Sequence, residues 1–271
     1  RMSTIRTKIA ALCLLNDEDL PLDRLALLFA AEHQAQDIDL DGCLHKLDTL
    51  ANDFLATDQP IRAEQLVTFL ADTQQFMGNT QDYGLADNSY LNRVLAVRRG
   101  IPITLALIYL SVAERVGIAA TGINFPGHFL IRFPEQDTIL IDPFAGRALS
   151  QSDCQTLLRQ NLGPGATLEA AHLEPANRRD LLMRLIENLK QGFWRARAWQ
   201  AAELCLEQQR LLRPNQAALK LQLANIRELR GDLESAKTLY TGLIETTKDS
   251  DVGKLAAQRL MAMGHSRRHL H

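Results

Sequence analysis

Two titratable side chains in the middle of the chain could act together in catalysis. His128 follows Pro126-Gly127, and Asp142 follows the apolar run at residues 139–141. A neutral imidazole can accept a proton from a nucleophile or from water, and a neighbouring carboxylate orients the ring and stabilises its charged form. This pair suits acyl transfer or amide hydrolysis if another group supplies the nucleophile. We therefore treat His128 and Asp142 as the candidate catalytic residues.

Period-two patterning predicts how these two residues are placed. Residues 129–133 and 138–141 are rich in aromatic and β-branched side chains and flank a short polar segment, which predicts a β-hairpin. If paired residue numbers sum to an even value such as 270 or 272, His128 and Asp142 lie on one face. An odd sum would place Asp142 among the apolar residues. The even register collects the following side chains on the other face: Phe129, Ile131, Phe133, Ile139 and Ile141.

A helix is expected immediately before this hairpin. Residues 103–116 are apolar on nearly every side of a helical wheel, which is typical of a buried helix. Pro102 suits its first turn and Gly117 suits the position after its end. A weaker pattern at residues 118–124 indicates a third strand.

The order of these features resembles the transglutaminase-like, papain-related superfamily. In that superfamily a Gly-x-Cys motif opens a buried helix, a Gly-Ile pair follows it, and a His and an Asp come from successive strands. Gly117-Ile118 matches the Gly-Ile pair, His128 the histidine and Asp142 the aspartate. Pro102 stands where the nucleophilic cysteine should be. The resemblance therefore implies a catalytic framework without its thiol, and neither Thr104 nor Ser111 is at the matching position.

Six motifs in order extend the resemblance to the bacterial SirB family over about residues 40–245. The resemblance implies a mostly helical α+β transglutaminase-like domain with a small antiparallel sheet, followed by all-α tetratricopeptide-like repeats. It also implies a regulatory association and no established reaction. The motifs are Phe76-x-Gly78-Asn79, Asp82-Tyr83, Asn88-Ser89-Tyr90-Leu91-Asn92, Arg99-Gly100-Ile101-Pro102-Ile103-Thr104-Leu105, Pro126-Gly127-His128-Phe129-Leu130 and Asp142-Pro143-Phe144.

Polar residues around these motifs are candidate binding residues. We expect them to line the cleft beside His128, although Asn88 or Ser89 could simply cap a helix over residues 90–97. The arginines and Asn92 could equally form a solvated helix face. The candidate binding residues are Asn88, Tyr90, Asn92, Arg99 and Thr104.

The chain is predicted to divide into residues 1–175 and residues 176–271. The first part carries amphipathic helical patterns at residues 18–33, 44–55 and 61–76, which we expect to cover the central segment. In the second part the sequence matches itself at an offset of 34 residues, the tetratricopeptide period, and helix breaks are expected near residues 197, 214 and 231. Matched positions include Leu185 with Leu219, Leu189 with Leu223, Ala202 with Ala236, and Leu206 with Tyr240.

Composition excludes several classes of protein. The four cysteines are scattered without a CxxC pair, which argues against a zinc site or a disulfide framework and suits the cytoplasm. Neither a metal nor a cofactor is expected, and the sequence shows no membrane-span pattern. Residues 1–175 carry 13 Lys/Arg and 22 Asp/Glu, whereas residues 176–271 carry 17 and 10. The basic part could dock on the acidic part or receive an acidic partner.

Two functions remain open from the sequence. The first is a non-catalytic regulator or adaptor that binds a protein or peptide partner through the degenerate cleft and the helical repeats, and Pro102 favours it. The alternative is an amide or peptide hydrolase that uses His128 and Asp142 without a cysteine nucleophile. Nucleic-acid binding is disfavoured because the excess basic charge is not accompanied by a recognition-helix motif.

Overall fold

The chain forms two compact units. A computed structural model describes residues 2–135, 137–247 and 250–266. The first unit extends to Asn188 and the second begins at Leu189, so the division falls inside helix α8 (Arg178–Arg195). The sequence placed its boundary just before this helix, at residues 175/176.

Helix α6 (Pro102–Val116) is the centre of the first unit. Thirteen of its fifteen residues are buried, because its apolar side chains face neighbours on all sides. Pro102 occupies the first helical position, and Gly117 ends the helix with a φ of 77°. The N–H of Ile118 then donates to the carbonyl of Ala113 over 2.9 Å. The predicted helix, its start and its stop are all confirmed.

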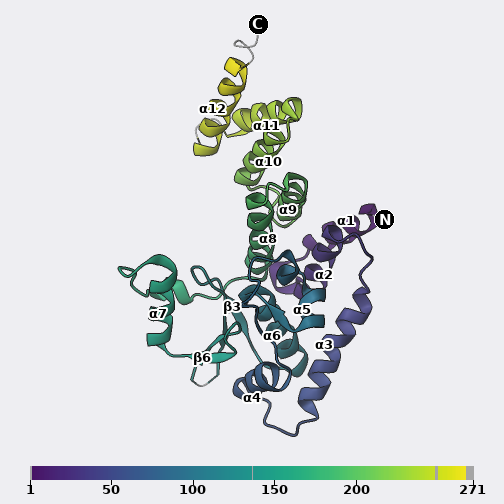
Figure 1. Ribbon diagram of the computed structural model, residues 1–271, viewed down its shortest axis with the longest axis vertical. Helices are drawn as coiled ribbons and strands as arrows, with labels where there is room; N and C mark the ends of the chain where they lie inside the picture. Colours follow the sequence, from purple (N-terminus) through teal and green to yellow (C-terminus); the bar gives the residue numbers. More distant parts are fainter. Residues whose placement is uncertain (1, 136, 248–249, 267–271) are drawn as a thin grey trace. The chain divides into compact units, whose positions relative to one another are not determined.

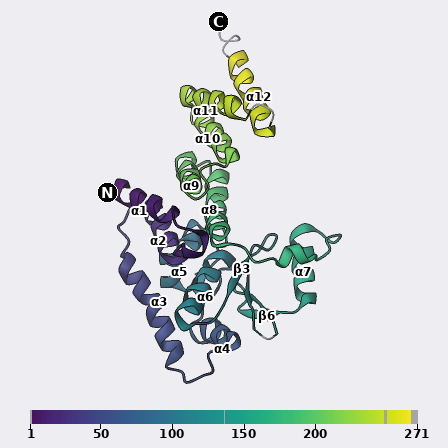
Figure 2. The same ribbon diagram turned by 180° about the vertical axis from the view of Figure 1, so that it is seen from behind.

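Helices α1 (Met2–Cys13), α2 (Leu22–His33) and α3 (Leu40–Leu55) belong to the N-terminal part of this unit. Helices α2 and α3 both contact α6, and α3 runs along the side of the unit opposite α7 (Figure 1, Figure 2). The expected helix at residues 18–33 begins only at Leu22, after a separate 3-10 turn at Asp17–Asp19. Helix α3 starts earlier than expected because the Asp39 carboxylate accepts a hydrogen bond from the N–H of Gly42 (2.9 Å) and caps it.

The predicted helix at residues 61–76 is shorter in the structure. It consists of α4 (Ala63–Thr68) and a π-helical turn, Phe69–Thr73, and a left-handed Gln75 (φ 62°) follows it. The chain then forms β1 (Met77–Gly78), which pairs in parallel with β2 (Arg99–Gly100). Between these two strands lie a 3-10 turn, Ala86–Ser89, and helix α5 (Leu91–Val97).

A four-stranded antiparallel sheet completes the first unit. Its strands follow chain order: β3 (Thr121–Ile123), β4 (Leu130–Phe133), β5 (Ile139–Asp142) and β6 (Arg147–Leu149). Ile131 pairs with Ile141 and Phe133 with Ile139, so the paired numbers sum to 272 and the even register is confirmed.

Both faces of this sheet carry packed side chains. Phe129, Ile131 and Phe133 are buried on the apolar face, as the register predicts. The opposite face is also covered, because Leu130 belongs to a buried cluster with Cys154 and Leu158 of α7 (Gln151–Leu162). The sequence did not predict β6 or α7.

The second unit is entirely helical within the residues that the structure describes. After the last turns of α8 come α9 (Trp199–Leu212), α10 (Ala217–Leu229), α11 (Leu233–Thr246) and α12 (Asp251–Ser266). The helix breaks therefore fall at residues 196–198, 213–216 and 230–232, where the periodicity predicts them. In neither unit is a described helix both long and apolar enough to cross a membrane.

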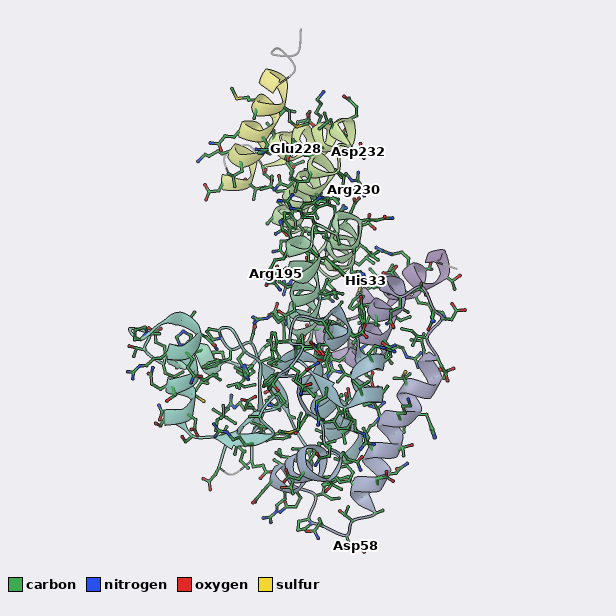
Figure 3. The ribbon with its side chains drawn as sticks, viewed as in Figure 1. His33, Asp58, Arg195, Glu228, Arg230 and Asp232 are labelled. Carbon is green, nitrogen blue, oxygen red and sulfur yellow. The ribbon has the colours of Figure 1, made fainter. Side chains whose placement is uncertain are left out.

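The backbone of the second unit repeats its geometry at an offset of 34 residues. Arg197 (φ 55°) and Gly231 (φ 82°) are both left-handed and follow α8 and α10. The residues after them, Ala198 and Asp232, have nearly the same dihedrals, with ψ values of 68° and 70°. Figure 3 labels Glu228, Arg230 and Asp232 at the α10–α11 connection. The matching backbone bonds are Arg197 N–H to Trp194 O and Gly231 N–H to Glu228 O, both 3.0 Å, and Ala198 N–H to Phe193 O and Asp232 N–H to Arg227 O, both 2.9 Å.

Candidate functional site

His128 and Asp142 are in direct contact. Nε2 of His128 lies 2.8 Å from Oδ1 of Asp142, and the two side chains are 13% and 10% exposed. The imidazole is therefore largely desolvated yet still reaches solvent. A carboxylate at this distance can fix the orientation of the ring.

His128 is held by a turn that precedes strand β4. We expected His128 and Asp142 on adjacent strands. His128 instead lies two residues before the first residue of β4. Its N–H donates to the carbonyl of Phe125 over 3.0 Å, and Gly127 adopts a φ of 68°. The Asn161 side chain of α7 donates to the carbonyl of Pro126 over 2.8 Å. This turn therefore fixes the backbone that carries the imidazole.

Asp142 is fixed from its C-terminal side. The same Oδ1 that contacts His128 accepts hydrogen bonds from the N–H groups of Phe144 (2.9 Å) and Ala145 (3.3 Å). The Asp142 carbonyl accepts from Gly146 over 2.8 Å and closes the turn into β6. The carboxylate is thus a structural acceptor as well as a partner for the imidazole.

Phe144 links this pair to the start of α6. Its ring meets that of His128 edge-on, with centroids 6.1 Å apart. Its carbonyl accepts from the N–H of Gly78 (2.9 Å), and a Cβ on Gly78 would lie only 2.4 Å from the Phe144 ring. Gly78 pairs with Gly100, two residues before Pro102. Because Gly78 has no side chain, the Phe144 ring can pack directly on it. Phe144 thereby connects His128 to the strand pair that leads into the N-terminus of α6.

No thiol stands at that helix start. The first helical residue is Pro102, which has neither a nucleophile nor an N–H. All four cysteines are buried, and none of them forms a disulfide in the described part of the chain. Burial raises the pKa of the Cys13 thiol to about 11, and it also raises the pKa values of the Cys43 and Cys154 thiols. These thiols stay protonated near neutral pH and are poor nucleophiles.

Cys154 is the cysteine that shares surroundings with the pair. Cys154 packs in the cluster that contains Leu130. Burial raises the pKa of its thiol, and the carboxylates of Asp153 and Asp142 raise it further. A nearby carboxylate without a neighbouring cation opposes thiolate formation. Cys154 is therefore a core residue in this structure.

A buried hydroxyl on α6 also lies within electrostatic reach of Asp142. Tyr109 is fully buried, and its Oη has no hydrogen-bond partner among the described residues. Burial raises the pKa of this phenol, and Asp72 and Asp142 raise it further. The sequence pattern predicted only that Tyr109 is part of the apolar helix.

Two of the predicted binding residues come together in an internal clamp. Thr104 Oγ1 donates to the carbonyl of Asn88 (2.6 Å) and accepts from the N–H of Ile101 (3.2 Å). Asn88 binds Asp82 and Tyr83 carbonyls through Nδ2, at 2.7 and 3.0 Å. The expected capping role is wrong, since Tyr90 precedes α5 and no side chain caps that helix. Asn88 and Thr104 instead hold the loop before α5 against the start of α6.

The other three predicted binding residues contact different parts of the unit. Tyr90 is buried and stacks on His33 with centroids 6.2 Å apart, and Asn92 exchanges amide hydrogen bonds with Gln34 (3.1 and 3.2 Å). Figure 3 labels His33 at the end of α2. Arg99 donates to the carbonyl of Gln75 over 2.6 Å. Their roles in binding a ligand remain predictions.

The donor set offers no evident metal site. Among the residues with described side chains, no three His, Cys, Asp or Glu groups come together as they would around a metal ion.

Comparison with known proteins assigns most of the first unit. Residues 39–187 match the family described as the transglutaminase-like superfamily. A "UPF0162 protein" of Xylella fastidiosa (strain 9a5c) is 35% identical over 263 residues, covering 89% of this chain and 90% of that protein. A "UPF0162 protein" of Pseudomonas aeruginosa is 35% identical over 189 residues, covering 67% and 68%.

A protein of a different name matches a shorter stretch of the chain. The mouse protein named "F-box only protein 21" is 36% identical over 130 residues, covering 44% of this chain and 20% of that protein. No solved structure matches the chain.

Proposed function

Because the chain belongs to the transglutaminase-like superfamily, we propose that it is a non-catalytic member: a regulator or adaptor that binds a protein or peptide partner in the old active-site cleft. The observation that carries this proposal is Pro102 at the start of α6 in a chain that keeps an ordered His128–Asp142 pair. Acyl transfer by this framework needs a thiolate at the helix start and an N–H for the oxyanion. Proline supplies neither.

The second unit supports a partner-binding role. The repeated left-handed residues and hydrogen bonds at an offset of 34 support tetratricopeptide-like repeats, which commonly present extended binding surfaces. The ordered motif series supports placing the chain in the SirB branch. Cysteines that form no disulfide among the described residues are compatible with a reducing compartment such as the cytoplasm.

One observation favours a second candidate function. The His128 imidazole is 13% exposed and paired with Asp142, so it could act as a general base toward a water molecule. The protein would then be an amide or peptide hydrolase that needs no cysteine.

A substrate panel separates these functions. Amides, esters and glutamine donors are incubated with wild type, with His128→Ala, and with a variant in which Cys13, Cys43, Cys154 and Cys205 are all replaced by Ser. If the protein is an adaptor, we expect neither wild type nor the cysteine-free variant to turn over any substrate faster than His128→Ala does. Turnover that survives the cysteine replacements but disappears in His128→Ala would instead identify the water-activating hydrolase.

A further inference from the structure

An arginine of α8 lies at the base of the turn that carries His128. Nη1 of Arg184 donates to Oδ1 of Asn124 over 2.8 Å, and Asn124 directly follows β3. In the described part of the chain, Arg184 forms no ion pair, and neither Nε nor Nη2 makes a hydrogen bond. Neither atom is among the buried unpartnered atoms. The Nε/Nη2 edge of the guanidinium is therefore open to a ligand.

An exposed aromatic ring lies near this arginine and contacts Phe144, which in turn contacts His128. Tyr83 is 52% exposed, and its ring meets that of Phe144 at 5.8 Å, while Phe144 meets His128 at 6.1 Å. Burial lowers the pKa of Arg184, and the nearby phenol of Tyr83 and the Glu187 carboxylate oppose that shift. Conversely, Arg184 moderates the raised pKa of Tyr83. Tyr83 and Arg184 are thus electrostatic neighbours.

The loop that presents Tyr83 is ordered before any ligand arrives. Asn88 binds the Tyr83 carbonyl and accepts from Asn79 over 3.0 Å, and the Asn79 side chain accepts from Asp82 N–H over 3.0 Å. Thr104 anchors the Asn88 carbonyl to α6. A pre-ordered loop lowers the entropic cost of binding.

We propose that Arg184 and Tyr83 form a subsite beside His128 that binds a carboxylate of a peptide ligand, with the Nε/Nη2 edge of Arg184 gripping the carboxylate and the Tyr83 ring covering the adjoining side chain. This inference rests on the proposed function, because it assigns the ligand class of the same cleft. A guanidinium edge matches the two oxygens of a carboxylate in a bidentate pair.

The charge of the surroundings favours a monoanion. Arg184 lies beside two neutral polar groups, Asn124 and the Tyr83 hydroxyl, and beside one acidic group, Glu187 of the same helix, and residues 1–175 carry 22 acidic against 13 basic side chains. A doubly charged phosphate would have one cation and an acidic background, whereas a carboxylate is balanced by a single guanidinium. The carboxylate can come from a peptide C-terminus or from an Asp or Glu side chain.

Peptide pools test the subsite on the full chain. Fluorescent random heptapeptides are prepared with a free C-terminus, with an amidated C-terminus, and in both forms without Asp and Glu, and binding is measured by anisotropy. Arg184→Gln is expected to weaken binding of the carboxylate-bearing pools about tenfold or more, and to leave the amidated pool without acidic residues unchanged. Arg184→Lys should recover only part of the loss. Arg62→Gln, which removes an exposed charge from the same unit, is the matched control and should bind like wild type.

The pools also distinguish the two carboxylate sources. A loss on amidation alone identifies a peptide C-terminus, and a loss on omission of Asp and Glu alone identifies an acidic side chain. Binding by wild type that ignores both changes and survives Arg184→Gln would overturn the subsite while leaving the peptide-binding function intact.

A second measurement does not depend on a peptide partner. Modification of Arg184 by a dicarbonyl reagent is followed by mass spectrometry with N-acetylphenylalanine or its amide present. Protection by the acid and not by the amide supports the subsite even if no peptide pool binds, in which case only the proposed function falls. Equal protection by both compounds, or by neither, would overturn the subsite.

Discussion

At the scale of single residues, one oxygen of Asp142 has three contacts. It lies 2.8 Å from His128 Nε2 and accepts two backbone N–H groups of the following turn. The side chain therefore orders both the imidazole and the β5–β6 connection. Asp142 therefore has a structural role that does not depend on catalysis.

Removing the Asp142 acceptor should cost stability. Asp142→Ala leaves the N–H groups of Phe144 and Ala145 without their acceptor, and we expect unfolding free energy to fall by about 2–4 kcal/mol. Asp142→Asn keeps one carbonyl oxygen and should lose less. Urea denaturation measures both, and an Asp142→Ala protein as stable as wild type would show that these bonds contribute nothing.

The raised pKa of the Cys13 thiol should make the unfolding free energy depend on pH in the alkaline range. Burial raises its pKa to about 11 in the folded protein, with Arg179 opposing the shift. A thiol with a raised folded pKa holds its proton longer than the unfolded chain does, so its contribution to stability is present below about pH 9 and is lost as the pH rises to about 11. Unfolding free energy measured from pH 8 to 11 should therefore fall more steeply in wild type than in Cys13→Ala. The cavity in the variant adds an offset that does not change with pH, so parallel curves would contradict the shift.

At the scale of elements, short polar clamps join segments that are distant in sequence. The Thr104 hydroxyl connects the start of α6 to Asn88, sixteen residues earlier. Its partners are buried main-chain groups, which cannot form hydrogen bonds with water instead. The Thr104 hydroxyl therefore helps to fix the position of the loop that carries Tyr83.

The hydroxyl of Thr104 can be tested with matched shapes. Thr104→Val keeps the volume but leaves the Ile101 N–H and the Asn88 carbonyl without partners, so a loss of about 1–3 kcal/mol in unfolding free energy is expected. Thr104→Ser keeps the hydroxyl and should lose clearly less. The clamp would be unimportant if the two variants were equally stable.

The turns of the second unit give an element-scale test of the repeat geometry. Arg197 and Gly231 are 34 residues apart and both left-handed, but only Gly231 adopts this conformation without a Cβ penalty. Arg197→Gly should therefore raise unfolding free energy by about 0.5–1 kcal/mol, and Gly231→Ala should lower it by about 1 kcal/mol. Space is not limiting at residue 231, since no atom lies within 4 Å of an added Cβ. Changes of the same sign in the two variants would contradict equivalent turns.

Local patterns predicted the elements whose signals are local. Period-two alternation predicted the β4–β5 register, and helical periodicity with Pro102 and Gly117 predicted α6. Strand β6 has only three residues and no alternation to reveal it, so it was missed. The helix predicted at residues 61–76 ends early because Gln75 has a left-handed backbone conformation. Glutamine is not a residue type from which that conformation is expected.

At the scale of the whole molecule, contacts between distant segments could not be predicted from patterns. Arg184 and Asn124 are 60 residues apart, and no motif links them. The sequence predicted the His128–Asp142 pair because both residues belong to one hairpin. It placed Tyr90, Asn92 and Arg99 beside His128 because they are polar and near the motifs, whereas the contacts recorded for them are with His33, Gln34 and Gln75. Proximity in sequence was a good guide only where a strand pairing supported it.

The central claim is that a transglutaminase-like framework persists without its nucleophile, and restoring the thiol tests it most directly. In Pro102→Cys the new thiol would start α6, and its titration can be followed by far-ultraviolet thiolate absorbance against Pro102→Ser as baseline. If the helix start and His128 still form one site, the new thiol should ionise below the ordinary value of about 8.5, and His128→Ala should raise its pKa. A Pro102→Cys thiol that ionises at or above the ordinary value, with no response to His128→Ala, would contradict the claim.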